Sequence, residues 1–307
     1  MPHTVFIDGA AGTTGLEIVE RLAPRAEFEL LILDDTQRKS AEARRDAFHA
    51  ADFAVLCLPD DAAREAVSLA EGSKVRIIDA STAHREAPGW TYGFPELVGR
   101  EVVTQAQRVA NPGCYPTGFL ALVAPLVRAG LLPADFPYTV NAVSGYSGGG
   151  KALIERFEAD PDIAFRAYGL ALGHKHLGEM QRYAALAHGP VFSPAVIAGH
   201  RGMVVDVPLP LAAMAGAAAP DALRQCLADF YAASEVVSVH QGVPDELLLR
   251  ASMAPSDRLE LWVCGAKDGS QARLVARLDN LGKGASGAAV QSLNLMAGLP
   301  ETAGLNL

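Results

Sequence analysis

The sequence predicts an α/β protein in which a doubly wound parallel sheet is followed by an α+β part with a mixed sheet. Strand-like runs alternate with helix-like runs over the first third of the chain, as in a parallel sheet covered on both faces. A glycine-rich turn at residues 9–15 directly follows the first of these strands. Further on, residues 259–265 and 272–278 form two strand-like runs that we expect to pair antiparallel.

Composition limits the kind of partner that this chain can have. Its 307 residues, 50% of them hydrophobic, suffice for two domains with sizeable cores. The net charge of −9 disfavours binding to nucleic acid or to an anionic membrane, so we expect small-molecule ligands. The four cysteines lack the paired spacing of a disulfide framework or a zinc site, and no metal is expected. No signal peptide and no apolar run of about 20 residues is found, which predicts a cytoplasmic protein.

The first strand-like run, residues 4–8, leads into the sequence GAAGTTG at 9–15 and then into an amphipathic helix. Glycines at this spacing allow a tight turn and the close approach of a pyrophosphate to the helix N-terminus. A glycine-rich turn also has purely structural uses, but its place after an N-terminal strand favours a Rossmann-type dinucleotide site. The predicted contacts are Gly9, Gly12, Thr13, Thr14 and Gly15.

The second strand, residues 28–33, ends in two acidic residues, Asp34 and Asp35. An acidic residue at this distance from the glycines usually binds a ribose 2′-hydroxyl and indicates NAD. Arg38 and Lys39 follow at once and could instead bind the 2′-phosphate of NADP. A solvated charged loop is the third interpretation, and these residues alone leave the three open.

Strands at residues 53–58 and 75–79 flank a helix at 61–70, and a polar loop that contains Ser81 and Arg85 follows. In open α/β sheets the carboxyl ends of the strands face the ligand, so this loop is a candidate binding element. A guanidinium can bind a phosphate or a carboxylate through two parallel hydrogen bonds, which makes Arg85 a candidate for substrate binding. His84 in the same loop is expected to be an ordinary surface histidine.

The sequence NPGCYPT at residues 111–117 places Cys114 between a tight turn and a long apolar run. Pro116 suits the first turn of a helix, so Cys114 should lie at or just before a helix N-terminus. The positive end of a helix dipole favours a thiolate, which is the nucleophilic form of cysteine. The alternative is a buried structural cysteine, and the glycine-rich segment downstream argues against it.

Two later segments supply partners for this cysteine. Residues 144–151, with sequence SGYSGGGK, follow a strand at 138–143 and are costly to order unless backbone must approach a ligand. His174 and His176 lie between glycines, with Glu179 after them, and no third metal ligand is near. One histidine is therefore expected to act with Cys114 as an acid or base, and the other to orient it or to bind substrate.

Together, these motifs resemble the short form of the N-acetyl-γ-glutamyl-phosphate reductases, within the wider aspartate-semialdehyde dehydrogenase-like group. The matching stretches are residues 9–15, Asp79-Ala80-Ser81 with Arg85, Tyr92-Gly93 with Pro95-Glu96, 111–117, Ser144-Gly145 with Ser147-Gly148, His174-Lys175-His176 with Glu179, Arg201-Gly202-Met203, and 279–284 through Asn294. They follow one another along nearly the whole chain. Lys151 replaces an arginine that is usual in the family, and residues 82–84 replace acidic and aromatic ones.

The resemblance implies NADPH-dependent reduction of an acyl phosphate to an aldehyde through a cysteine thioester, in arginine biosynthesis. It implies that Cys114 is the nucleophile and His176 the acid or base, with His174 as its alternative or as a substrate contact. Ser81, Ser147, Gly148 and Asn280 would bind the cofactor, and Asn111, Ser144 and Gly145 the substrate.

The family's fold implies a cofactor domain over 1–112, completed by a helix within 285–307, and a catalytic domain over 113–284. A homodimer or homotetramer is implied as well. Aspartate-semialdehyde dehydrogenase or a related acyl-phosphate reductase is the alternative enzyme, and a dinucleotide-binding sensor is the alternative from another class.

Overall fold

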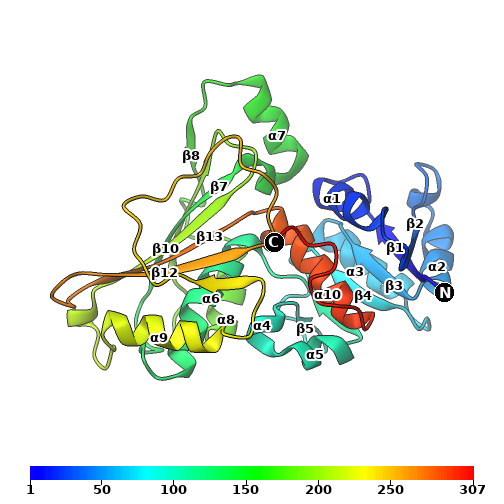
Figure 1. The fold of residues 1–307 in the computed structure, drawn as a ribbon. Coiled ribbons are helices and arrows are strands. Elements are labelled where there is room, and N and C mark those ends of the chain that lie inside the picture. Colours follow the sequence, from blue (N-terminus) through cyan, green and yellow to red (C-terminus); the bar gives the residue numbers. More distant parts are fainter. The chain divides into compact units, whose positions relative to one another are not determined.

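The computed structural model describes residues 1–307, which form two compact units (Figure 1). Unit one comprises Met1–Pro112 and Ala285–Leu305, and unit two comprises Gly113–Gly284 and Asn306–Leu307. Unit one is thus built from both ends of the described chain. None of the helices has the length and apolar character that a membrane crossing requires.

Unit one contains a six-stranded parallel sheet in the order β2-β1-β3-β4-β6-β5. Its strands are β1 (His3–Asp8), β2 (Phe28–Leu31), β3 (Phe53–Leu56), β4 (Arg76–Asp79), β5 (Thr91–Tyr92) and β6 (Arg108–Ala110). The chain moves from β1 to β2 on one side and then continues with β3 on the other side of β1. In sheets of this kind, the point where the strand order reverses is where ligands bind, beyond the carboxyl ends of the strands.

Helices cover both faces of this sheet. Successive residues of β1 point to opposite faces, and each face has its own hydrophobic core with its own helices. Val5 and Ile7 share a hydrophobic core with residues of α1 and α10, whereas Phe6 shares a second core with residues of α2 and α3. The helices of unit one are α1 (Thr13–Leu22), α2 (Ala41–Ala50), α3 (Asp60–Leu69), α4 (Pro95–Val98), α5 (Arg100–Gln105) and α10 (Gly287–Met296). The predicted doubly wound sheet is confirmed.

Unit two contains a seven-stranded mixed sheet in the order β11-β12-β13-β10-β7-β9-β8. Its strands are β7 (Thr139–Gly145), β8 (Phe165–Ala167), β9 (Val191–Ile197), β10 (Met203–Leu209), β11 (Val237–Val239), β12 (Leu259–Gly265) and β13 (Ala272–Leu278). β12 and β13 pair antiparallel, as predicted, while β7 and β9 are parallel. The mixed sheet of the predicted second part is therefore confirmed.

The helices of unit two are α6 (Cys114–Arg128), α7 (Gly150–Ala159), α8 (Leu177–Tyr183) and α9 (Pro220–Phe230). α6 packs tightly on β10 and β13, where Gly118 makes the approach possible. A Cβ atom at residue 118 would lie 2.7 Å from Cγ2 of Val205 and 3.4 Å from Cβ of Ala276. Almost the whole of α6 is buried, from Tyr115 to Leu126. Its first residue, Cys114, is therefore carried by a rigid element.

Candidate active site

Cys114 is the first residue of α6, after Gly113 in an extended conformation, and no side chain caps this helix end. The backbone beside the thiol is held from two sides. The Gly113 N–H donates to Oε2 of Glu179 over 3.1 Å. A Cβ atom at Gly284 would lie 2.9 Å from Cβ of Cys114, so only glycine allows this turn to pack against it. The predicted position of Cys114 at a helix N-terminus is confirmed, and such an uncapped end favours the thiolate form of a cysteine.

His174 and His176 lie in the loop before α8, and their ring centroids are 4.7 Å apart. Both rings contact Tyr115, the neighbour of Cys114, with centroid distances of 6.1 Å and 6.0 Å. Glu179 in the first turn of α8 reaches the backbone at Gly113, as described above. The structure thus gathers the predicted nucleophile and the two predicted histidines in one part of unit two.

The two histidines differ in their hydrogen bonding. The backbone N–H of His176 donates to Nδ1 of His174 over 3.1 Å. Because Nδ1 accepts this bond, it carries no proton, and His174 must be the neutral tautomer with its proton on Nε2. Burial, with a smaller contribution from Lys175, lowers the pKa of His174 to about 4. His174 is therefore suited to hold its neighbour and unsuited to be the cation that stabilises a thiolate.

Tyr115 and Tyr168 form a buried pair of phenols beside these histidines. The Tyr168 hydroxyl donates to the Tyr115 hydroxyl over 3.3 Å, and Tyr115 donates to the Ala195 carbonyl over 3.1 Å. Burial raises the pKa of Tyr168 to about 12 and raises that of Tyr115 further, so both stay neutral. Sequence reasoning missed Tyr168, since nothing around it marks a motif.

The predicted residues of the glycine-rich segment meet those of the 279–284 turn. The Asn280 amide donates to Oγ of Ser147 over 2.9 Å, and its oxygen accepts from the Gly202 N–H over 2.9 Å. Gly145 donates to the Gly202 carbonyl over 2.8 Å. A Cβ atom at Gly148 would lie 3.2 Å from Oγ of Ser144. Asn280 therefore ties together the loops that contain the predicted cofactor and substrate residues of unit two.

Arg201 belongs to the same network, although its role was not predicted. Its guanidinium is ion-paired with Asp279, with 2.9 Å between Nη1 and Oδ2. The other carboxylate oxygen of Asp279 accepts the Leu281 N–H over 2.9 Å. This pair fixes the start of the turn that carries Asn280 and Gly284.

In unit one, the glycine loop has the properties of a phosphate site. Gly9 has a φ of 92°, and a Cβ atom there would collide with the Cys57 carbonyl group. A Cβ at Gly15 would lie 2.9 Å from Cα of Ala10. Gly12 precedes α1, whose N-terminus no side chain caps. Its first backbone N–H groups, at Thr13 and Thr14, are thus left for an anion, and the residues fit a dinucleotide pyrophosphate.

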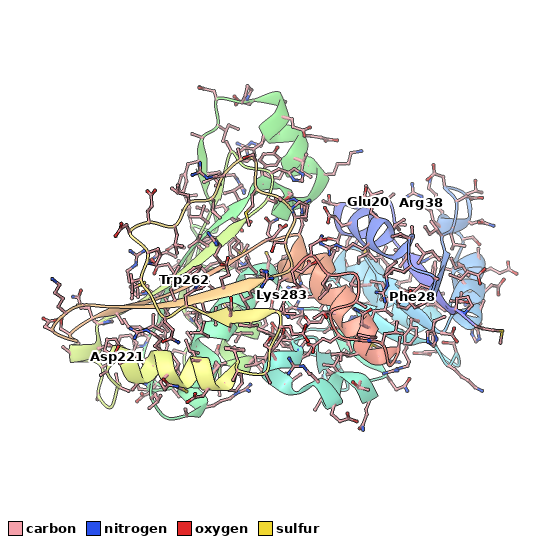
Figure 2. The ribbon with its side chains drawn as sticks, viewed as in Figure 1. Glu20, Phe28, Arg38, Asp221, Trp262 and Lys283 are labelled. Carbon is pink, nitrogen blue, oxygen red and sulfur yellow. The ribbon has the colours of Figure 1, made fainter.

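The loop after β2 holds its charges in a defined arrangement. Oδ1 of Asp34 accepts the N–H groups of Thr36 and Gln37 over 2.8 Å each, which closes the turn. Arg38 is ion-paired with Asp35 at 2.9 Å, and its side chain is labelled in Figure 2. Lys39 is exposed beside it. This loop therefore holds both the acidic residues that could bind a ribose 2′-hydroxyl and the basic residues that could bind a 2′-phosphate. Arg38 and Asp35 are already paired with each other.

The loop after β4 is organised by Asp79. Its carboxylate accepts the Ser81 N–H over 2.9 Å and the Ser81 hydroxyl over 2.8 Å, and lies 2.6 Å from Nδ1 of His84. The expectation of a surface histidine was wrong: His84 is buried and stacks on Trp90, 4.2 Å between centroids. The sequence did not reveal this burial, because it depends on the stacking of His84 on Trp90, six residues later in the chain.

The remaining two candidates of unit one lie together. Nε of Arg85 donates to the Asn111 carbonyl over 2.9 Å. The Asn111 amide donates to the Ala285 carbonyl over 2.9 Å. Arg85 is thus anchored at the end of β6, in the residues that lead to Cys114 in sequence.

Comparison with known proteins defines the class. Residues 114–280 match the family model "Semialdehyde dehydrogenase, dimerisation domain", and residues 34–106 match "Semialdehyde dehydrogenase, NAD binding domain". Two solved structures share the fold. Aspartate semialdehyde dehydrogenase II from Vibrio cholerae, complexed with ASA, has a TM-score of 0.73 at 16% identity, covering 96% of this chain and 98% of that chain. Aspartate semialdehyde dehydrogenase with NADP from Candida albicans has a TM-score of 0.69 at 14% identity, with the same coverage. The chain is an oxidoreductase of the semialdehyde dehydrogenase class.

Similarity in sequence narrows the class further. The chain is 49% identical to N-acetyl-gamma-glutamyl-phosphate reductase 2 of Nostoc sp., over 98% of each chain. It is 49% identical to N-acetyl-gamma-glutamyl-phosphate reductase of Rhizobium meliloti, over 96% of this chain and 99% of the relative. The chain belongs to the N-acetyl-gamma-glutamyl-phosphate reductase family, which confirms the resemblance drawn from its motifs.

Proposed function

We propose that the protein reduces N-acetyl-γ-glutamyl phosphate to N-acetylglutamate 5-semialdehyde with NADPH and releases phosphate, as a step of arginine biosynthesis. The observation that carries the proposal is Cys114 at the uncapped N-terminus of α6, with both histidine rings against the adjacent Tyr115. The names of the relatives supply the substrate class.

In the first step, the Cys114 thiolate attacks the acyl carbon, a sulfur–carbon bond forms, and the carbon–oxygen bond to phosphate breaks. The phosphate leaves with the electron pair, and the acyl group remains as a thioester. His176 in its cationic form would stabilise the thiolate beforehand. His174 would hold His176 in place, because its Nδ1 accepts the His176 N–H.

When bound, the reduced nicotinamide supplies a hydride to the thioester carbon. Ser81 and the loop from Gly9 to Gly15 would hold the dinucleotide in unit one, and Ser147, Gly148 and Asn280 would contact it from unit two. His176 and backbone N–H groups at the start of α6 would stabilise the resulting oxyanion. The sulfur–carbon bond then breaks, the electron pair returns to Cys114, and the aldehyde leaves.

Substrate binding would involve Arg85, Asn111, Ser144 and Gly145, which are held in the two networks described above. The preference for NADPH over NADH rests on Arg38 and Lys39, whose charges suit a 2′-phosphate. The match of residues 114–280 to a dimerisation domain supports a homo-oligomer, a dimer or a tetramer.

The test is the reverse reaction, followed as phosphate-dependent formation of NADPH from NADP⁺. N-acetylglutamate semialdehyde and aspartate semialdehyde are compared as substrates at equal concentration. We expect turnover of the acetylated aldehyde, dependent on phosphate, and little turnover of aspartate semialdehyde. Preference for aspartate semialdehyde, or no reaction with either aldehyde, would contradict the proposal.

A further inference from the structure

Arg166 is a half-buried arginine on β8, at the edge of the unit two sheet, in a chain of net charge −9. Its guanidinium lies over the ring of Tyr168, 4.7 Å from the ring centroid. No carboxylate of residues 1–307 forms an ion pair with it, and no hydrogen bond from it is seen. A positive charge partly withdrawn from water and without an anion is costly unless a ligand supplies one.

Strand register places Arg166 on the same side of the sheet as the predicted substrate residue Ser144. Arg166 of β8 is directly opposite Val196 of β9, and Val196 is directly opposite Ser144 of β7. Residues opposite one another on neighbouring strands point to the same face. Two strand spacings separate the backbones of Arg166 and Ser144, about 10 Å in all.

This face is also the one that carries the neighbour of Cys114. Phe192 and Val196 are four residues apart on β9, so their side chains point to the same face of the sheet. The Phe192 ring lies 5.1 Å from the Tyr115 ring, measured between centroids. Tyr168, two residues after Arg166, donates its hydroxyl to the Tyr115 hydroxyl. A continuous row of side chains therefore leads from Tyr115 through Tyr168 to the Arg166 guanidinium.

The other groups of this row are neutral. Burial keeps the pKa of Tyr168 at about 12 and lowers that of His174 to about 4. The Glu179 carboxylate accepts a hydrogen bond from the Gly113 N–H at the start of α6, away from this row. The row therefore offers a substrate one cation, and the side chains of Tyr115 and Tyr168 lie between this cation and Cys114.

We propose that Arg166 binds the α-carboxylate of the N-acetylglutamyl chain, and that Tyr168 holds its guanidinium in position. The proposal rests on the proposed function. The phosphate is bonded to the very carbon that Cys114 attacks, whereas the α-carboxylate is four carbon–carbon bonds away, roughly 5 Å along an extended chain. Because side chains lie between Arg166 and Cys114, this cation suits the more distant anion of the substrate, the α-carboxylate. Arg166 would thus select aldehydes that carry this carboxylate.

The test uses the reverse reaction with N-acetylglutamate semialdehyde and with 4-acetamidobutanal, which lacks only the α-carboxylate. For Arg166→Gln we expect KM for the first aldehyde to rise on the order of 10- to 100-fold, with KM for phosphate unchanged. For Arg166→Lys, KM for the first aldehyde should lie between the values of wild type and Arg166→Gln, since lysine keeps the charge and loses the two parallel hydrogen bonds. With 4-acetamidobutanal, wild type and Arg166→Gln should have equal kcat/KM.

Lys267→Gln is the matched control, because it removes one exposed cation from the turn between β12 and β13, to which no part of the site is assigned. It should leave KM for the aldehyde unchanged. An equal rise in KM for Lys267→Gln, a rise in KM for phosphate in Arg166→Gln, or an equal loss with both aldehydes would overturn the assignment. So would wild-type kinetics in Arg166→Gln.

If wild type turns over neither aldehyde, the proposed function fails, and the Arg166 site is then decided by binding. Calorimetry with N-acetylglutamate and 4-acetamidobutyrate should show that wild type prefers the former. Arg166→Gln should lose this preference. Equal binding of the two acids by wild type would reject the carboxylate site.

Discussion

Nδ1 of His174 accepts the backbone N–H of His176, so two histidines that look alike in the sequence have different chemistry. The bond fixes the tautomer of His174 and the backbone from which the His176 ring projects. We expect His176→Asn to lower kcat by roughly 100- to 10,000-fold, as for the loss of a general acid or base. His174→Asn can keep an acceptor near the place of Nδ1, so its kcat should fall less than about tenfold, and His174→Ala should be the more harmful of the two. Steady-state kinetics of the three variants would decide, and the ranking is wrong if His174→Asn is as inactive as His176→Asn.

Cys114→Ser should abolish turnover while leaving the binding of NADPH nearly unchanged. A serine hydroxyl is far less ionised than a thiol at neutral pH, so the loss should reach several orders of magnitude. The dinucleotide phosphates are assigned to the loop from Gly9 to Gly15, where this substitution changes nothing. Fluorescence titration with NADPH and a sensitive turnover assay measure the two effects. Substantial activity in the serine variant would exclude Cys114 as the nucleophile.

The four thiols should react with iodoacetamide at very different rates near pH 7. Burial, with the nearby carboxylates of Asp79 and Asp8, raises the pKa of Cys57 to about 12. Burial also raises the pKa of Cys226 and Cys264. Cys114 alone lies at an uncapped helix N-terminus, and mass spectrometry of timed samples should find it labelled first. Slow and uniform labelling of all four would contradict an activated thiol.

The variant Arg38→Ala/Lys39→Ala should lower the preference for NADPH over NADH by roughly 10- to 100-fold. Both cations follow β2, where a 2′-phosphate is expected, and Arg38 is oriented by its ion pair with Asp35. The measurement is the ratio of kcat/KM for the two cofactors. Arg45→Ala, an exposed site on α2, is the control and should keep the wild-type ratio. A wild-type preference for NADH would refute the choice of cofactor, and an unchanged ratio in the double variant would remove only these two residues.

His174 should make the protein less stable in acid. Its pKa is lowered to about 4 in the folded protein from the ordinary value of 6.5, so between these values the unfolded chain binds more protons. Stability should therefore fall as pH falls from 6.5 toward 4, and be unaffected by this group above 6.5. Urea unfolding midpoints at pH 5 and pH 7.5 would show the difference. In His174→Asn the difference should be smaller, and the explanation fails if it is unchanged.

Much of the fold could be predicted because its signals are local. The glycine loop at 9–15 and the strands at 259–265 and 272–278 follow from short-range patterns, and the strands have the bounds expected for them. The three-residue edge strand β8 and the two-residue β5 were not predicted, since so few residues carry no usable periodicity. The helix α2 was also missed, because its charged residues hide the few that are buried.

The residues of the candidate site were easier to find than their roles. Cys114 stands out through the turn and helix start around it. The division of labour between His174 and His176 depends on one backbone N–H, and the burial of His84 depends on the stack with Trp90. Arg166 gave no signal at all, since its position on the face of Ser144 is known only once three strands are in register.

The helix α10 carries a consequence for how the protein is made. Ala289, Val290 and Leu293 belong to the same hydrophobic core as Val5 and Ile7 of the first strand. Of two domains in a chain, the one made earlier usually folds first during synthesis. Here the part of the core that α10 supplies is translated after residues 113–284 of unit two, so β1 must wait for a helix that is made much later. During that interval the apolar residues of β1 lack the part of their core that α10 supplies, and such exposed surface is prone to aggregation.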